Sequence, residues 1–245
     1  MTKSAGAVLA GLAALPELEA HIFLSSRRPL ILAPHPDDES LGCGGLIAAA
    51  CALGLAPVVV ILTDGAASHP GSSSYPPARL RAVRRAEARD ALKLLGVPSE
   101  QMLFLDYPDG NLPRPEGAGL QLLDQLAAIT KRWACGLLLA PWEEDPHCDH
   151  KAAAKLGAAL AASCKLELWH YSVWGWLLPR EALVQAVPLP GWRILIENYL
   201  PLKRKAIAAH SSQHGELITD SAQAFVLPEA LLAISTRRHE VYFPA

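Results

Sequence analysis

The sequence predicts an α/β protein with a Rossmann-like, doubly wound and mostly parallel sheet. Short apolar runs alternate with segments of helical periodicity along most of the chain. The runs are apolar at nearly every position, which is typical of strands that are buried on both faces. With 245 residues, 51% of them hydrophobic and 19% charged, the chain is long and apolar enough for one well-buried domain.

The expected strands and helices follow one another in regular alternation. The strand candidates are Leu30–Ala33, Val58–Leu62, Met102–Leu105, Leu137–Ala140 and Leu166–Tyr171, and the helix candidates lie near 44–54, 77–95, 117–133 and 150–163. We expect these elements to form a core of about residues 28–171. Residues 172–245 should elaborate the same single domain, 1–245, with a short helix near 202–210 and short strands at Ala224–Leu227 and Glu240–Phe243.

Two apolar segments invite other interpretations. Residues 41–62 carry no charge, but Gly54 and Pro57 interrupt them, so we expect a buried helix and strand and no membrane span. Residues 1–20 could be a signal peptide, but their apolar part runs into Glu17 and Glu19 without a clear cleavage pattern, so an amphipathic helix is favoured.

Cysteine usage and charge narrow the class of protein further. The five cysteines contain no Cys-x-x-Cys pair, which argues against a disulfide framework and favours a reducing, cytoplasmic location. The net charge is −2 and no basic stripe is present, so we expect no nucleic-acid partner.

Polar residues follow four of the predicted strands directly. They are His35-Pro36-Asp37-Asp38, Thr63-Asp64-Gly65, Asp106 to Gly110, and Glu143 to His150. Open α/β sheets bind ligands at the carboxyl edge of their strands, so these groups should meet there. Charge beside a dry strand costs free energy unless it is paired or metal-bound.

This residue set suits a catalytic metal ion. Zinc takes three ligands from His, Asp or Glu in such sites and keeps one position open, and Fe²⁺ also accepts two His and one Asp. His35 and Asp38 lie at a strand-to-helix turn, and His150 begins the next helix, so it is the best third ligand.

Other residues would then remain for proton transfer and support. Asp37 could take a proton from an activated water, and His147 could act as an acid or an electrostatic partner. Asp64 or Glu39 would orient a ligand histidine.

Each feature also has a simpler explanation when it is taken alone. Backbone groups could satisfy His35, and the two aspartates after it could cap the next helix. The segment Gly42-Cys43-Gly44-Gly45 invites a nucleotide-loop interpretation, but it lacks the Gly-x-Gly-x-x-Gly spacing, so close helix packing is favoured. Trp174 and Trp176 could be platforms for a sugar, or could pack in the core or an oligomer interface.

At five places the chain resembles the LmbE-like, PIG-L-type N-acetylglucosaminyl deacetylases. The matching segments are Pro34-His35-Pro36-Asp37-Asp38-Glu39, Thr63-Asp64-Gly65, Arg84-Arg85-Ala86-Glu87 before Leu94-Leu95-Gly96-Val97, His147-Cys148-Asp149-His150, and Lys205 with Ala209-His210-Ser211-Ser212-Gln213. Together they span roughly residues 30–213. Cys148 stands where the family usually has proline.

The resemblance implies a role for particular positions. It implies that His35, Asp38 and His150 bind zinc, that Asp37 is the general base, and that His147 is a general acid or stabilises the tetrahedral intermediate. Arg84 and Asp109 would contact the sugar.

We therefore expect a zinc-dependent hydrolase that removes an N-acetyl or other N-acyl group from a glucosamine-type sugar or its conjugate. The alternatives are a metal-stabilised sugar-binding protein with little catalysis and a dinucleotide-binding oxidoreductase. The expected partner is a small molecule, and assembly into a homo-oligomer stays open.

Overall fold

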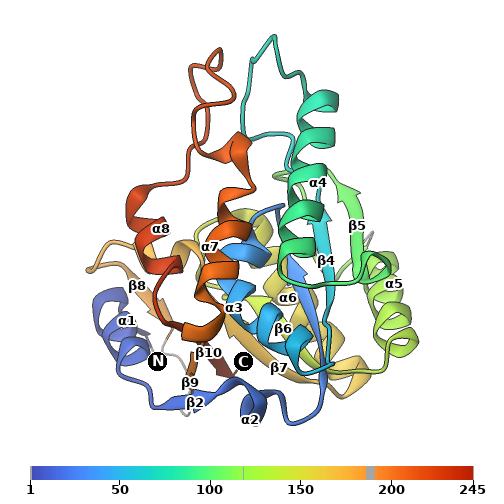
Figure 1. Cartoon of the computed structure of the whole chain (residues 1–245), viewed down its shortest axis with the longest axis vertical. Coiled ribbons are helices and arrows are strands. Elements are labelled where there is room, and N and C mark those ends of the chain that lie inside the picture. Colours follow the sequence, from blue (N-terminus) through green and yellow to red (C-terminus); the bar gives the residue numbers. More distant parts are fainter. Residues whose placement is uncertain (1, 118, 186–190, 245) are drawn as a thin grey trace.

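The computed structural model describes residues 2–117, 119–185 and 191–244, and its centre is a mixed sheet (Figure 1). In this part of the chain the sheet has eight strands in the order β2-β9-β10-β7-β6-β3-β4-β5. Its parallel core consists of β3 (Arg28–Ala33), β4 (Val58–Thr63), β5 (Met102–Tyr107), β6 (Cys135–Pro141) and β7 (Glu167–Tyr171).

The five core strands lie where the sequence predicts them, and the predicted fold class is confirmed. β4 pairs with one side of β3, whereas β6 pairs with the other side. The strand order therefore reverses between β3 and β6. In open α/β sheets a ligand site lies outside the carboxyl ends of the strands at such a reversal.

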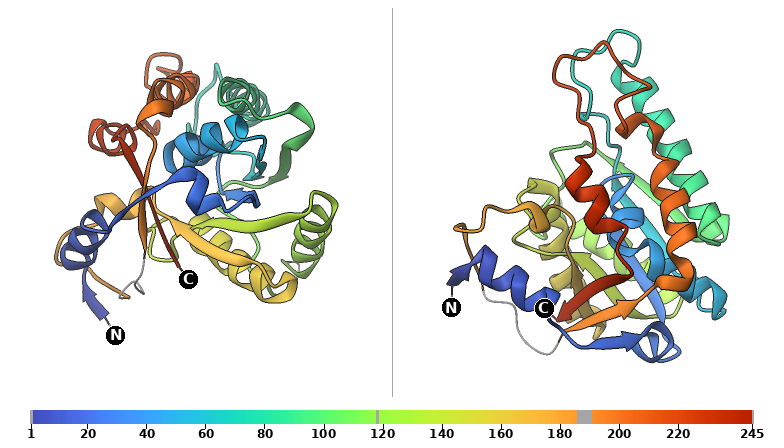
Figure 2. Two further views of the ribbon diagram at one scale, coloured as in Figure 1. Left: turned by 60° about the horizontal axis from the view of Figure 1, so that its bottom comes forward. Right: turned by 60° about the vertical axis from the view of Figure 1, so that its left-hand side comes forward.

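Helices cover both faces of the sheet. One face packs against α2 (Ala20–Leu24), α3 (Asp38–Ala52), α4 (Pro77–Leu94), α7 (Leu200–Ala208) and α8 (Glu229–Ser235), and the other packs against α5 (Gly119–Arg132) and α6 (Cys148–Cys164). The left view of Figure 2 shows the sheet between these two layers. Alternate side chains of one strand serve opposite faces, so Ile31 packs with α3 and Leu32 with α6.

The C-terminal elaboration extends the sheet beyond β7. β10 (His239–Pro244) is antiparallel to β7 and to β9 (Trp192–Leu195), and β2 (Glu17–Glu19) completes that edge. The predicted strand at Glu240–Phe243 is thus confirmed. The predicted strand at Ala224–Leu227 is wrong, because this segment makes only isolated backbone bonds, from Ala224 to Ser221, from Phe225 to Ser68 and from Leu227 to Gln213.

The N-terminal helix is shorter than predicted. α1 covers Ala5–Ala13 and is flanked by β1 (Thr2–Ser4), which pairs with β8 (Leu183–Gln185). The acidic segment after α1 forms β2 instead of a last helical turn. None of the helices in the described ranges is long and apolar enough to cross a membrane, and residues 41–62 form most of α3 and β4 as expected.

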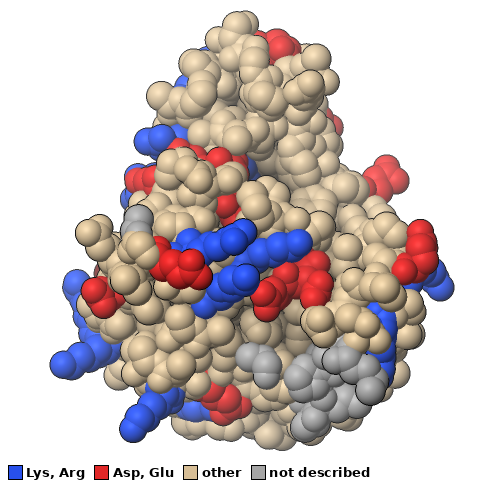
Figure 3. All heavy atoms as spheres, turned by 180° about the vertical axis from the view of Figure 1, so that it is seen from behind, with Lys and Arg blue, Asp and Glu red and all other residues tan. Residues whose placement is uncertain are grey.

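The surface carries charges of both signs. On the face shown in Figure 3, Lys and Arg side chains lie next to Asp and Glu side chains, and the protruding end of the molecule carries few of either.

All five cysteines are free.

The glycines of α3 permit close packing, as the sequence favours. A Cβ added to Gly45 would lie 2.5 Å from a carbon of Ile196, and one added to Gly44 would lie 3.0 Å from Lys203. Gly42 faces the Tyr171 ring in the same way. The space beside each of these glycines is filled by a side chain, so the segment does not form a phosphate-binding loop.

We expect Gly45→Ala to lower the free energy of unfolding by about 1–3 kcal/mol, because the new methyl group overpacks the core against Ile196. Urea denaturation would measure the change. Gly11→Ala is the matched control, since this exposed helical position has no neighbour within 4 Å and should be neutral or stabilising. Equal stability of the two variants would contradict the packing role.

Candidate metal and catalytic site

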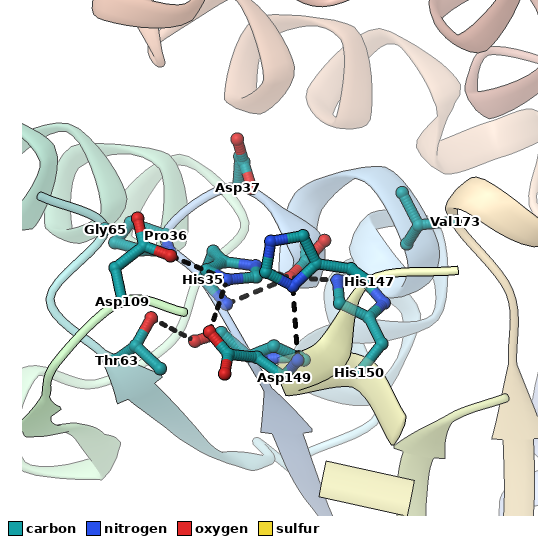
Figure 4. A network of polar contacts seen from close by, with 12 residues as sticks. His35, Pro36, Asp37, Thr63, Gly65, Asp109, His147, Asp149, His150 and Val173 are labelled. Atoms are coloured by element: carbon teal, nitrogen blue, oxygen red, sulfur yellow. Dashed lines mark hydrogen bonds and ion pairs between the residues drawn. The ribbon is translucent and has the colours of Figure 1, made fainter. Parts of the chain in front are cut away.

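The predicted site residues meet at the reversal of the strand order. His35, Asp37 and Asp38 follow β3, whereas His147 and His150 come from the start of α6, directly after the loop that leaves β6. They line, or lie directly beneath, a cavity of about 320 Å³. Figure 4 shows the three imidazoles turned toward one another, with Asp109 and Asp149 on the His35 side.

Three buried side chains converge on one point. His35 Nδ1 and His150 Nε2 each lie 3.1 Å from the same atom, Asp38 Oδ2. Although His150 Nε2 is that close to Asp38, it has no hydrogen-bond partner of acceptable geometry within the described residues. A buried ring nitrogen that faces a carboxylate without a good hydrogen bond fits a metal ligand, so these residues could hold an ion.

The far nitrogen of each histidine is held by a carboxylate. His35 Nε2 lies 3.1 Å from Asp149 Oδ2, and His150 Nδ1 lies 3.1 Å from Asp145 Oδ2. In the neutral rings, these contacts favour a proton on the far nitrogen and leave the near nitrogen free for a metal, as is usual around histidine ligands.

The expectation that Asp64 or Glu39 orients a ligand histidine is wrong. Asp64 Oδ2 instead pairs with Arg81 at 2.6 Å, and Glu39 serves the backbone of Asp37 and the ring of His210. Asp149 lies inside the predicted motif, and Asp145 is one of three consecutive acids, so residue type alone could not select Asp145.

Asp145 is itself firmly held. It is fully buried, and its oxygens accept hydrogen bonds from Ser172 Oγ at 2.6 Å and from the backbone N–H of Val173 and Gly175 at 2.9 and 2.8 Å. A carboxylate with this many donors is held in one position, so it can orient His150 with little freedom.

The cluster carries an excess of negative charge. Five carboxylates surround the histidines and the buried guanidinium of Arg84: Asp37, Asp38, Asp109, Asp145 and Asp149. Burial by itself lowers the pKa of His150, but Asp38 and Asp145 together outweigh burial and raise the pKa to about 9. The site therefore attracts positive charge strongly, which is what a divalent cation would supply.

Asp37 has a strained backbone and a fixed side chain. Its φ of 135° lies in a region that non-glycine residues rarely adopt. Arg84 Nη2 donates to Asp37 Oδ2 at 3.0 Å and to Pro36 O at 2.6 Å, while Glu39 Oε2 accepts the Asp37 N–H at 3.0 Å. Burial raises the pKa of Asp37 to about 6 although Arg84 opposes the shift.

His147 caps α6 with its ring. Its Nδ1 accepts the backbone N–H of Asp149 at 3.2 Å, so in the neutral ring the proton sits on Nε2. Burial lowers the pKa of His147, and the neighbouring His35 and His150 lower it further. The ring lies 4.5 Å from that of His35 and lines the cavity, where it can donate a hydrogen bond.

The two expected sugar contacts and Trp174 also line the cavity. Arg84 is 3% exposed and is engaged with the Asp37 segment. Asp109 Oδ1 lies 3.2 Å from His35 Nε2; burial would raise the pKa of Asp109, but His35 brings it to about 2. Trp176, in contrast, packs against the small cluster around α1.

The two remaining motifs hold elements together around the site. Glu87 accepts hydrogen bonds from Ser212 N at 2.8 Å and Ser212 Oγ at 2.7 Å, and thus ties α4 to the segment after α7. His210 Nε2 lies 3.1 Å from Glu39 Oε1. Cys148 is exposed at the first position of α6.

Residues 30–161 match the family model described as PIG-L, GlcNAc-PI de-N-acetylase. This match covers more than half of the chain, so the chain belongs to the PIG-L family, as the sequence motifs predict. Over 219 residues, 85% of this chain and 78% of the relative, it is 26% identical to the diacetylchitobiose deacetylase of Thermococcus kodakarensis.

Solved structures share the fold. The N,N'-diacetylchitobiose deacetylase of Pyrococcus horikoshii superposes with a TM-score of 0.66 and 20% identity over 96% of this chain and 88% of that one. The 4-carboxy-2-hydroxymuconate hydratase GalB of Pseudomonas putida superposes with a TM-score of 0.60 and 16% identity over 88% of this chain and 93% of that one. Since the fold serves a hydratase too, the reaction must be argued from the site. The family description and the curated relative share the expected class, an N-deacetylase hydrolase.

We expect Asp145→Asn to weaken zinc binding by roughly 10- to 100-fold, because the amide no longer fixes the His150 ring. Competition with a chromophoric chelator would measure the affinity. Glu143→Gln, an exposed change two residues earlier, is the control and should bind zinc like the parent protein. Unchanged affinity in Asp145→Asn would remove Asp145 from this role.

Proposed function

We propose that the protein is a zinc-dependent N-deacetylase of glucosamine-type amino sugars. The observation that carries this proposal is the convergence of His35 Nδ1 and His150 Nε2 on one oxygen of Asp38 at the end of the cavity, with Asp37 beside them. Two histidines and one carboxylate with space on one side are the pattern of a catalytic site, whereas structural zinc sites are closed.

In this proposal the metal would activate the amide and the water, and the side chains would hold the metal and transfer the proton. His35, Asp38 and His150 hold the ion, which when bound supplies Lewis-acid polarisation of the amide and a reactive water at neutral pH. Asp37 accepts the proton of the attacking water, and Arg84 keeps its carboxylate aimed at the cavity.

In this proposal His147 stabilises the charge that develops on the oxygen of the reacting amide. With its proton on Nε2, the neutral ring donates a hydrogen bond to the developing oxyanion. The amine leaves after protonation by Asp37 or His147. Both residues line the cavity, and neither is needed for a site that only binds metal. Their presence favours catalysis over a purely sugar-binding protein.

The substrate class rests on the relatives and on the cavity. The family description names a GlcNAc-PI de-N-acetylase, and the curated relative is named a diacetylchitobiose deacetylase. A volume of about 320 Å³ is near the lower end for ligand pockets and suits one sugar ring with its acetamide. A dinucleotide has no place at Gly42 to Gly45, where side chains fill the space.

Asp37→Asn should abolish acetate release from N-acetylglucosamine conjugates, by at least about 100-fold, and leave the zinc content unchanged. Mass spectrometry of the products and metal analysis of the same sample would measure both. Asp124→Asn, on the exposed face of α5, is the matched control. Near-normal turnover in Asp37→Asn would exclude Asp37 as the base.

His150→Ala should lose the metal, because the third ligand is removed. Chelation of the parent protein should stop acetate release, and added Zn²⁺ should restore it; a parallel arm with Fe²⁺ under anaerobic conditions tests the second ion. Full zinc occupancy in His150→Ala would contradict the proposed ligand set. Undiminished activity after complete metal removal would contradict the mechanism.

A further inference from the structure

Two loops that project beyond the sheet are joined to each other. One, residues 64–76, connects β4 to α4, and the other, residues 214–228, connects the segment after α7 to α8. Figures 1 and 2 show them side by side at the protruding end of the molecule. Neither loop contains a strand, so side chains and single backbone bonds must hold them.

The hydrogen bonds between the outer parts of the two loops centre on Asp220. Its carboxylate accepts hydrogen bonds from Ser72 Oγ at 2.7 Å and from the backbone N–H of Ser73 and Ser74, both at 2.9 Å. Ser221 Oγ adds a bond to Pro70 O at 2.8 Å. A carboxylate that caps consecutive N–H groups of another segment fixes the distance between the two segments.

A second set of hydrogen bonds connects the two loops to each other and to the site beside the cavity. Phe225 N donates to Ser68 O at 2.8 Å, and Ala67 N donates to Asp109 Oδ2 at 3.0 Å. The first bond connects the two loops to each other, and the second connects the first loop to Asp109 of the site. The position of the loops therefore depends on Asp220 at the outer end and on Asp109 at the inner end.

The joined loops form the outer wall of the cavity. Ala67, Ser68 and Pro70 come from the first loop and Gln223 and Phe225 from the second. The Trp174 ring completes the wall, with its centroid 5.4 Å from that of Phe225 in an edge-on arrangement.

Every side chain of this wall is uncharged. The charged groups of the cavity lie instead at its inner end, and there they are mostly acidic. Aromatic rings beside one amide and one hydroxyl suit the apolar face and the hydroxyl groups of a neutral sugar. A phosphate attached to the sugar would find no cationic partner along this wall.

We propose that this wall selects neutral N-acetyl amino sugars and their neutral glycosides over phosphate-linked ones, and that Asp220 is the positioning residue that sets it. The proposal rests on the proposed deacetylase function and adds the substrate class. Asp220 lies outside the residues that line the cavity, so it acts only through the loops that it joins.

The test compares Asp220→Ala with the parent protein on N,N'-diacetylchitobiose and on UDP-N-acetylglucosamine. The parent should show a kcat/KM at least tenfold higher for the neutral substrate. Asp220→Ala should raise KM for that substrate roughly fivefold to tenfold, with kcat within about twofold and the zinc content unchanged. Asp220→Asn keeps one acceptor oxygen and should fall between the two, and Asp124→Ala, on exposed α5, is the control.

Several outcomes would overturn the proposal. An Asp220→Ala variant with a lower kcat and the parent KM would indicate loss of folded protein and no positioning role. A preference of the parent for the UDP-linked sugar would contradict the neutral class.

A readout without turnover separates this proposal from the deacetylase function. Quenching of tryptophan fluorescence by N-acetylglucosamine should persist in chelator-treated protein, and Trp174→Phe should lose most of it. If the parent releases no acetate but binds the sugar in this way, the deacetylase function is wrong and the sugar-binding role of the wall is supported. If the parent releases acetate and its KM does not depend on Asp220, the deacetylase function is supported and the positioning role of Asp220 is wrong.

Discussion

The carboxylates buried at the reversal of the strand order are the constraint on which the rest of the structure depends. An unpaired buried charge costs several kcal/mol, and here Asp38, Asp145 and Asp149 are almost completely inaccessible to solvent. Two histidines and backbone N–H groups offset only part of that charge. A bound divalent cation would supply the remainder, so metal binding and stability should be coupled in this protein.

The C-terminal elaboration completes the site as well as extending the sheet. Asp37 stays in a strained conformation because Arg84 binds one side of its segment and Glu39 binds its N–H. Glu39 is in turn held by His210, which follows α7. The residue proposed as general base thus depends on a segment about 170 positions later in the chain.

The sequence predicts the core strands and the proposed metal ligands better than the residues that hold those ligands in place, for physical reasons. Strands buried on both faces leave a run of apolar residues, and His35, Asp38 and His150 stand out because charge follows those runs. Helix α3 starts at Asp38, before the helix predicted near 44–54, and it follows the positive φ of Asp37, which no local pattern encodes. The partners of Asp145 come from a distant segment, so its role could not be predicted from its own neighbours.

Asp145 also connects the two ends of the cavity. The same Oδ2 atom that faces His150 Nδ1 accepts the backbone N–H of Trp174 at 3.1 Å. Since a carboxylate held by several donors moves little, the simplest consequence is rigidity: the aromatic wall and the metal site keep a constant separation. In the proposed reaction, a fixed separation of that kind would align the acetamide of one class of sugar with Asp37 and misalign others.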